Sequence, residues 1–136
     1  MTISNKQVVR AFTEEVLGRG KDHLLPTLVS ADYVLHLSLG DHYGADGTRI
    51  DIAAWREGFA DLTLSLEDLL GEGDRVVRRF VLRGTHSGPF LGFAATGNGI
   101  EVSGIAIDRL HDGLIQESWM LIDLYGLVQR LNGERS

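Results

Sequence analysis

The hydrophobic residues of this chain change their spacing about halfway along the sequence. Val8, Phe12 and Val16 recur every four residues, as they do on one face of an α-helix. From Leu62 onward, apolar and polar residues instead alternate with a period of two, which is typical of β-strands. Helices first and a run of antiparallel strands later predict an α+β fold in which the helices cover one side of a sheet.

Three helices are predicted in the first half. The first is expected to begin at Ser4, which has a glutamine three residues later and so the spacing of a capping box. A short second helix is expected around Pro26, because proline is tolerated in a first turn. Residues 40–47 are interpreted as a loop, and Thr48 is expected to cap the third helix. The apolar face of that helix carries Ile52, Trp55 and Phe59.

The second half predicts four long strands, over 62–70, 75–86, 100–110 and 114–123. Strands of this length favour a strongly curved sheet, closed on one side by the helices. A pocket is expected between the two layers, because ligands usually bind in such hollows. The whole chain, 1–136, is interpreted as one domain.

The charge balance narrows the range of partners. The chain has 13 basic and 19 acidic residues, a net charge of −6, so nucleic acid and anionic membranes are not expected to bind. It has no cysteine, no signal-peptide pattern and no apolar run near the length of a membrane helix, so a cytoplasmic location is expected. The five histidines match no compact ligand spacing, so neither a metal nor a cofactor is expected.

The segment 114–126, LIQESWMLIDLYG, holds the most specific pattern. Glu117, Trp119 and Asp123 share one face of the predicted strand. If this face lines the pocket, burial raises the pKa of Asp123 and makes it a candidate general acid and base. Two structural alternatives stay open: Asp123 caps the helix that follows, and Glu117 pairs with Arg79 or Arg109 on a neighbouring strand.

Four segments, 67–86, 84–93, 102–119 and 121–131, resemble the SnoaL-like polyketide cyclase family. The resemblance implies the cystatin-like fold of nuclear transport factor two, which is usually dimeric. It also implies ring closure of a polyketide by an intramolecular aldol condensation without metal or cofactor. Asp123 matches the acid/base aspartate of the family, whereas Ser118 stands where the family usually has histidine, and the strand over 102–110 lacks the histidine that contributes in the cyclases.

We therefore expect a cofactor-independent cyclase or isomerase that acts on a planar, polyketide-like substrate. Asp123 is the expected acid/base, and His36 is either a donor to a substrate carbonyl or a histidine of purely structural role. The residues expected to contact substrate are Trp119, Trp55, Phe12, Tyr33, Phe59, Arg79 and Glu117. The alternatives are a cofactor-free hydroxylase or dehydratase, and a non-catalytic binding or dimerisation module. A homodimer is expected to form through the outer face of the sheet, which carries Val77 and Val81.

Overall fold

The computed structural model describes residues 4–132, so the ends of the domain expected over 1–136 lie outside the described residues. The first helix, α1 (Asn5–Ala11), begins at the predicted capping box: the backbone N–H of Gln7 donates to the Ser4 hydroxyl, and that of Ser4 donates to the Gln7 side chain. The helix continues as a π-helical segment, η1 (Phe12–Leu17). A 3-10 turn, η2 (Asp22–Leu24), then leads into α2 (Leu25–Leu28), which has Pro26 in its first turn.

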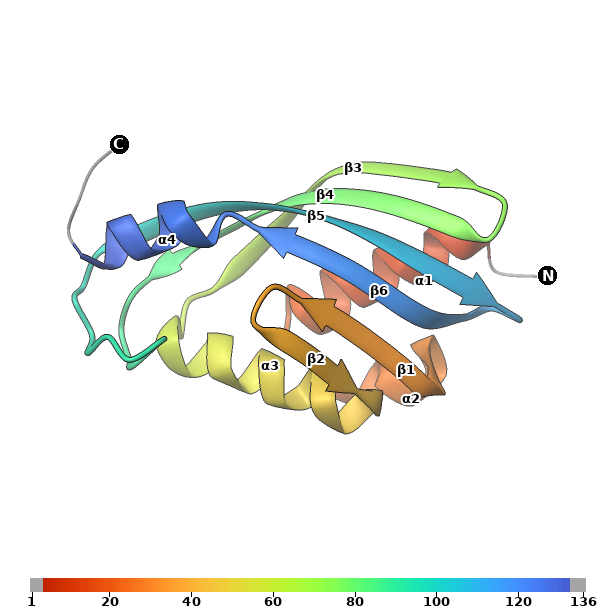
Figure 1. Cartoon of the computed structure of the whole chain (residues 1–136), viewed down its shortest axis with the longest axis horizontal. Helices are drawn as coiled ribbons and strands as arrows, with labels where there is room; N and C mark the ends of the chain where they lie inside the picture. The colour runs from red at the N-terminus through yellow and green to blue at the C-terminus, as the bar shows by residue number, and fades with distance from the viewer. Residues whose placement is uncertain (1–3, 133–136) are drawn as a thin grey trace.

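Six strands form one curved sheet in the order β2-β1-β6-β5-β4-β3. Their bounds are β1 (Val29–Leu37), β2 (Gly40–Tyr43), β3 (Thr63–Glu72), β4 (Arg75–Thr85), β5 (Gly99–His111) and β6 (Leu114–Ile122). Neighbouring strands are antiparallel except β1 and β6, which are parallel. The long strands arch over α1 and α3 (Gly44–Gly58), and α4 (Leu124–Leu131) follows β6 directly (Figure 1). The predicted α+β fold with a curved sheet is confirmed.

The segment interpreted as a loop is in fact ordered structure. Residues 40–43 form β2, and α3 begins at Gly44, four residues before the expected cap. Thr48 is therefore not a cap: it is buried inside the helix, where its hydroxyl donates to the Gly44 carbonyl. The short hairpin between β1 and β2 brings this edge of the sheet beside α3.

The pairing register fixes which side chains face the helices. In β4 and β5 the even-numbered residues are buried, apart from the half-buried Gly84, and most odd-numbered residues are exposed or half-buried. Since Trp119 pairs with Ile107 and Ser118 with Asp108, the even-numbered residues of β6 also face inward. The outer face of β6 therefore carries Glu117, Trp119 and Leu121, while the inner face carries Ser118, Met120 and Ile122.

A buried polar network ties the sheet to the N-terminal helices. Arg78 donates two hydrogen bonds, of 2.9 and 3.1 Å, to the Asp108 carboxylate and a third, of 3.3 Å, to Thr13 of η1. Ser118 also donates to Asp108, and the Tyr33 hydroxyl donates to Ser118 over 2.8 Å. All five residues are fully buried, and this closed network fixes the register of β1, β6, β5 and β4 against η1. No helix within the described residues is long and apolar enough to cross a membrane.

Candidate active site

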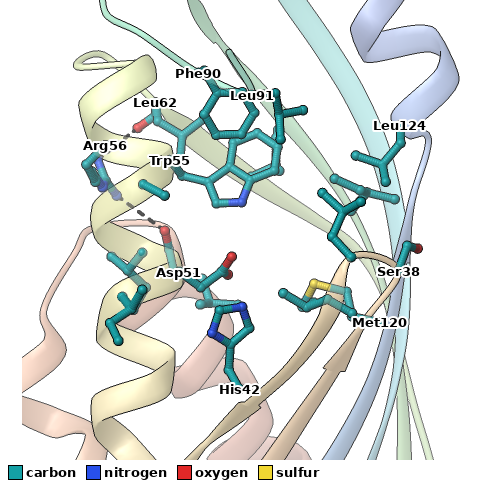
Figure 2. Close-up of a pocket in the computed structure, with 18 of the residues that line it drawn as sticks. Ser38, His42, Asp51, Trp55, Arg56, Leu62, Phe90, Leu91, Met120 and Leu124 are labelled. Carbon is teal, nitrogen blue, oxygen red and sulfur yellow. Dashed lines mark hydrogen bonds between the residues drawn. The ribbon is translucent and has the colours of Figure 1, made fainter.

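A cavity of about 250 Å³ lies between α3 and the inner face of the sheet (Figure 2). Its size is close to the lower end of the range of small-ligand sites. Its walls come from α3, the β1–β2 hairpin, β3, β4, β6 and the loop between β4 and β5. A pocket between the helices and the curved sheet is thus present where the sequence predicted it.

Aromatic side chains form one end of the cavity. The rings of Trp55 and Phe90 lie 4.7 Å apart, and Leu91 lies at the mouth beside them (Figure 2). Phe90 and Phe93 exchange backbone hydrogen bonds around a two-residue turn in which Leu91 and Gly92 have φ values of 49° and 80°. Positive φ at both positions is the signature of a type I′ turn, so this tight hairpin holds Leu91 at the rim.

Two ionisable side chains meet on the cavity wall at the end opposite the aromatic residues. Asp51 comes from α3 and His42 from β2, and Figure 2 shows both directed into the cavity, one beside the other. Both residues are half-buried. Across the cavity, the sheet contributes Met120 and the apolar residues of β6 and β4, so a ligand that contacts Asp51 would lie against apolar surface on its other side.

The Asp51 carboxylate is poorly solvated. Burial raises its pKa above the ordinary value of 3.8, and the charge of nearby His42 lowers it only in part. Within residues 4–132 we find no hydrogen-bond donor to this carboxylate. A carboxylate that is held in an apolar cavity without a fixed partner is a stronger base than one in water, so Asp51 is suited to proton transfer.

The expectation that Asp123 faces the pocket is wrong. Asp123 is exposed and lies outside the cavity lining, where its carboxylate accepts a 2.9 Å hydrogen bond from the backbone N–H of Gly126. It is the N-cap of α4, which is the structural alternative that the sequence left open. The catalytic role expected for Asp123 depended on burial, and its solvent-exposed position removes that basis.

Glu117, Trp119 and His36 also lie outside the pocket, on the outer face of the sheet. His36 stacks on Trp119 at 5.7 Å and contacts Glu117 over 2.6 Å and Asp41 over 2.9 Å. Glu117 raises the pKa of His36 most, and Asp41 adds to the effect; His36 in turn lowers the pKa of Glu117. Of the two partners considered for Glu117, the structure confirms Arg109, at 3.2 Å, whereas Arg79 pairs with Asp68 on the same outer face.

Of the five aromatic residues expected to line the pocket, Trp55 lies in its wall, whereas Trp119 lies on the outer face of the sheet. The other three are fully buried core residues rather than lining residues. Phe12 and Tyr33 pack edge to face under the N-terminal helices, and Phe59 packs behind Trp55 and Phe90. None of the three is among the residues that line the pocket.

Asp51 and His42 were missed by the sequence analysis. Asp51 lies four residues before Trp55, so the two share one face of α3, and Trp55 was expected in the pocket. That spacing is the signal that would have identified Asp51. His42 lay in a segment interpreted as a loop, and nothing in its neighbours indicated that it faces inward. Among the described residues, no three His, Cys, Asp or Glu side chains come close enough to hold a metal ion.

A curved, mostly antiparallel sheet that is closed by helices around an apolar cavity is the architecture of the cone-shaped α+β class that includes nuclear transport factor two. The model of one family, described as SnoaL-like polyketide cyclase, matches residues 7–131. The chain therefore belongs to the SnoaL-like polyketide cyclase family, as its sequence motifs indicated.

Solved structures agree with this assignment. A candidate SnoaL-like polyketide cyclase from Jannaschia sp. CCS1 is 23% identical over 99% of each chain, with a TM-score of 0.87. IdmH, a candidate polyketide cyclase from Streptomyces antibioticus, is 27% identical over 96% of this chain and 99% of its own, with a TM-score of 0.84. TsrD from Streptomyces laurentii is 30% identical over 96% of this chain and 98% of its own, with a TM-score of 0.83. No curated protein sequence matches the chain.

Proposed function

We propose that this protein is a cofactor-independent cyclase or isomerase in which Asp51 moves protons on a planar, polyketide-like substrate. One observation carries the proposal: the Asp51 carboxylate projects into an apolar cavity beside His42, and burial raises its pKa. Family membership supports the polyketide-like substrate class. The apolar walls and the Trp55 ring suit a flat aromatic compound.

The proposed step needs no co-reactant. The Asp51 carboxylate takes a proton from a carbon that is flanked by carbonyl groups, and the electron pair left behind spreads into the conjugated substrate. In a cyclisation, that carbon attacks a second carbonyl carbon of the same molecule, which forms the carbon–carbon bond. The C=O π electrons become an alkoxide, which takes up the proton that Asp51 removed, either directly or through His42, so that the Asp51 carboxylate is regenerated. The pocket mainly holds the two carbons together, and such positioning can contribute about 7–11 kcal/mol.

Hydrogen exchange on the substrate carbon tests the acid/base role without requiring the natural substrate. The probe is a planar aromatic compound with a 1,3-dicarbonyl side chain, and NMR follows its exchange in D₂O. Asp51→Asn should lower the enzyme-dependent exchange rate by about 10²–10⁴-fold, the usual contribution of a general base. The matched control is Asp46→Asn, which changes an exposed carboxylate of the same helix. Equal exchange rates in the two variants would contradict the proposal.

A hydroxylase needs dioxygen, whereas a cyclase or isomerase does not. The same enzyme preparation, assayed with and without dioxygen, therefore distinguishes the two functions. Under anaerobic conditions a cyclase or isomerase keeps its full rate, whereas a hydroxylase loses its turnover. A non-catalytic binding module would show saturable binding of the probe with no enzyme-dependent exchange. The cytoplasmic location expected from the sequence stays a prediction.

We also propose that the chain is a homodimer formed through the outer face of the sheet. Ile107 pairs with Trp119 and Ile105 with Leu121, and these four side chains are 41%, 37%, 47% and 63% exposed. An apolar band of this kind on a sheet face is typical of an interface. Sedimentation at micromolar concentration should report a dimer, and Leu121→Lys should dissociate it, whereas Ala53→Lys on exposed α3 should not. A wild-type monomer would contradict this assembly.

A further inference from the structure

We propose that Leu91 is a ligand-contacting residue, and that a leucine is kept at this position for binding although it lowers the stability of the fold. The inference rests on the proposed function only for the premise that a planar ligand binds in the cavity. It does not require that Asp51 transfers protons.

Leu91 occupies a backbone conformation that disfavours leucine. Within residues 4–132, Leu91 and Asp112 are the only residues other than glycine with a positive φ. Each is the first residue of a two-residue turn, and a glycine follows it. The two turns have nearly the same shape, with φ values of 49° and 80° at Leu91 and Gly92 and of 51° and 77° at Asp112 and Gly113. Turns of this type favour asparagine, aspartate or glycine at the first position, so Asp112 suits its turn and Leu91 does not.

Burial within the protein does not explain the leucine. Leu91 is 41% exposed, whereas the preceding Phe90 is buried in the hydrophobic core. An asparagine at position 91 would relieve the backbone strain and would present a polar group to water instead of an apolar one. The fold alone therefore does not favour leucine at this position.

The turn is fixed against the end of α3. The backbone N–H groups of Ser87 and Gly88 donate to the Gly58 carbonyl over 2.9 and 3.1 Å. A Cβ at Gly58 would lie 2.8 Å from the Cβ of Phe90, so the helix end and the start of the turn are in direct contact. A strained residue persists where its surroundings hold it, and strain of this kind is concentrated at ligand sites. The Leu91 side chain is thus presented at a defined place on the rim of the cavity.

A ligand would contact Leu91 at the end farthest from the proposed chemistry. Trp55 follows Asp51 by one helical turn, about 6 Å along α3, and Leu91 lies beside Trp55 at the mouth (Figure 2). A ligand whose reacting carbon contacts Asp51 therefore reaches Leu91 only if its flat ring system extends along the cavity. Leu91 would then cover the outer edge of the ligand, and the burial of its side chain favours binding. Contacts that are remote from the reacting carbon also help to position it.

Two probes with the same 1,3-dicarbonyl side chain test the inference. 1-Phenylbutane-1,3-dione has one ring, and 1-(2-anthryl)butane-1,3-dione has three fused rings and can reach the rim. Equilibrium dialysis measures both dissociation constants, and thermal melting measures stability. Leu91→Asn should weaken binding of the anthryl probe about tenfold, leave binding of the phenyl probe unchanged, and raise the melting temperature by about 2–4 °C.

Two further variants separate the side chain from the turn. Leu91→Met keeps a flexible apolar side chain of similar size and should retain the affinity for the anthryl probe. Asp112→Leu makes the reciprocal change in the matching turn between β5 and β6, remote from the cavity lining. It should lower the melting temperature by a similar amount and leave both affinities unchanged.

The inference is overturned if Leu91→Asn binds the anthryl probe as tightly as the wild type, if it loses affinity for both probes equally, or if it melts at a lower temperature than the wild type. Absence of anthryl-probe binding to the wild type would overturn it as well. These outcomes are independent of proton transfer. If Leu91→Asn behaves as expected but Asp51→Asn retains full hydrogen exchange, the role of Leu91 stands and the proposed function fails. If Asp51→Asn abolishes exchange but Leu91→Asn binds normally, the proposed function stands and the role of Leu91 fails.

Discussion

Gly47, in the second turn of α3, packs directly against His42 of β2. A Cβ at position 47 would lie 3.0 Å from the His42 carbonyl carbon and 3.1 Å from its Cβ. The absence of a side chain at Gly47 therefore sets how closely the helix approaches the strand that carries His42.

Gly47→Ala is expected to lower the catalytic activity while leaving the stability of the protein nearly unchanged. Alanine favours the helix by up to about 1 kcal/mol, which offsets the crowding, so the melting temperature should change little. The displaced His42 should lower kcat of proton exchange more than it raises KM. His42→Gln provides the comparison, since both variants should lose the same step. A Gly47→Ala protein with unchanged kcat would show that the position of His42 is not critical.

Adjacent arginines of β4 allow a direct comparison of a buried and an exposed ion pair. Asp108→Asn removes the buried partner of Arg78 and should destabilise the protein by about 3–5 kcal/mol, because an unpaired charge remains in the core. Asp68→Asn removes the partner of Arg79 at the surface and should cost less than about 1 kcal/mol. Urea unfolding measures both values. Similar losses in the two variants would contradict the structural role of the buried network.

The His36–Glu117 pair predicts how stability changes with pH. Glu117 and Asp41 raise the pKa of His36 above 6.5, and His36 lowers that of Glu117 below 4.5. The stabilisation from His36 is therefore complete below pH 6.5 and is lost as pH rises through its raised pKa, while that from Glu117 is lost only in acid. His36→Asn should remove the alkaline loss in melting experiments. His23→Asn, at an exposed site, should preserve it, and a wild-type curve that is flat above pH 6.5 would contradict the pairing.

The ionised Asp51 side chain is expected to lower the free energy of unfolding of the protein. Because its pKa is raised in the folded state, a stability penalty appears as pH rises from the unfolded value of 3.8 through the raised value. Asp51→Asn should therefore raise the melting temperature at pH 8 and raise it less at pH 4.5. A variant that is less stable than the wild type at pH 8 would indicate that Asp51 makes stabilising contacts instead.

The sequence predicted the fold more completely than the site. The capping box at Ser4 and the switch to period-two spacing both depend on local chemistry, so the corresponding elements could be predicted. The alternation in β6 correctly placed Glu117 and Trp119 on one face and Ser118 on the other. Alternation does not say which face is buried, and a shift of one residue exchanges them.

The prediction of which face of β6 lines the pocket was wrong because both faces of the sheet carry apolar residues. The outer face has Trp119 and Ile107, whereas the inner face has Ser118 and Asp108, whose burial depends on a network with Arg78. Arg78 lies 30 positions from Asp108, and Tyr33 lies 85 positions from Ser118, so no local pattern reveals the network. Asp51 was overlooked for a different reason: a lone acid on an amphipathic helix normally faces water, so its spacing from Trp55 was not read as a signal.

The most direct measurement compares two aspartates that could each serve as the base. Carbon–hydrogen exchange on the dicarbonyl probe is measured for Asp51→Asn and Asp123→Asn under identical conditions. We predict that Asp51→Asn loses exchange by about 10²-fold or more, while Asp123→Asn keeps the wild-type rate and loses at most about 1 kcal/mol of stability through its weakened helix cap. Loss of exchange in Asp123→Asn together with an active Asp51→Asn would contradict the assignment of the site to this cavity.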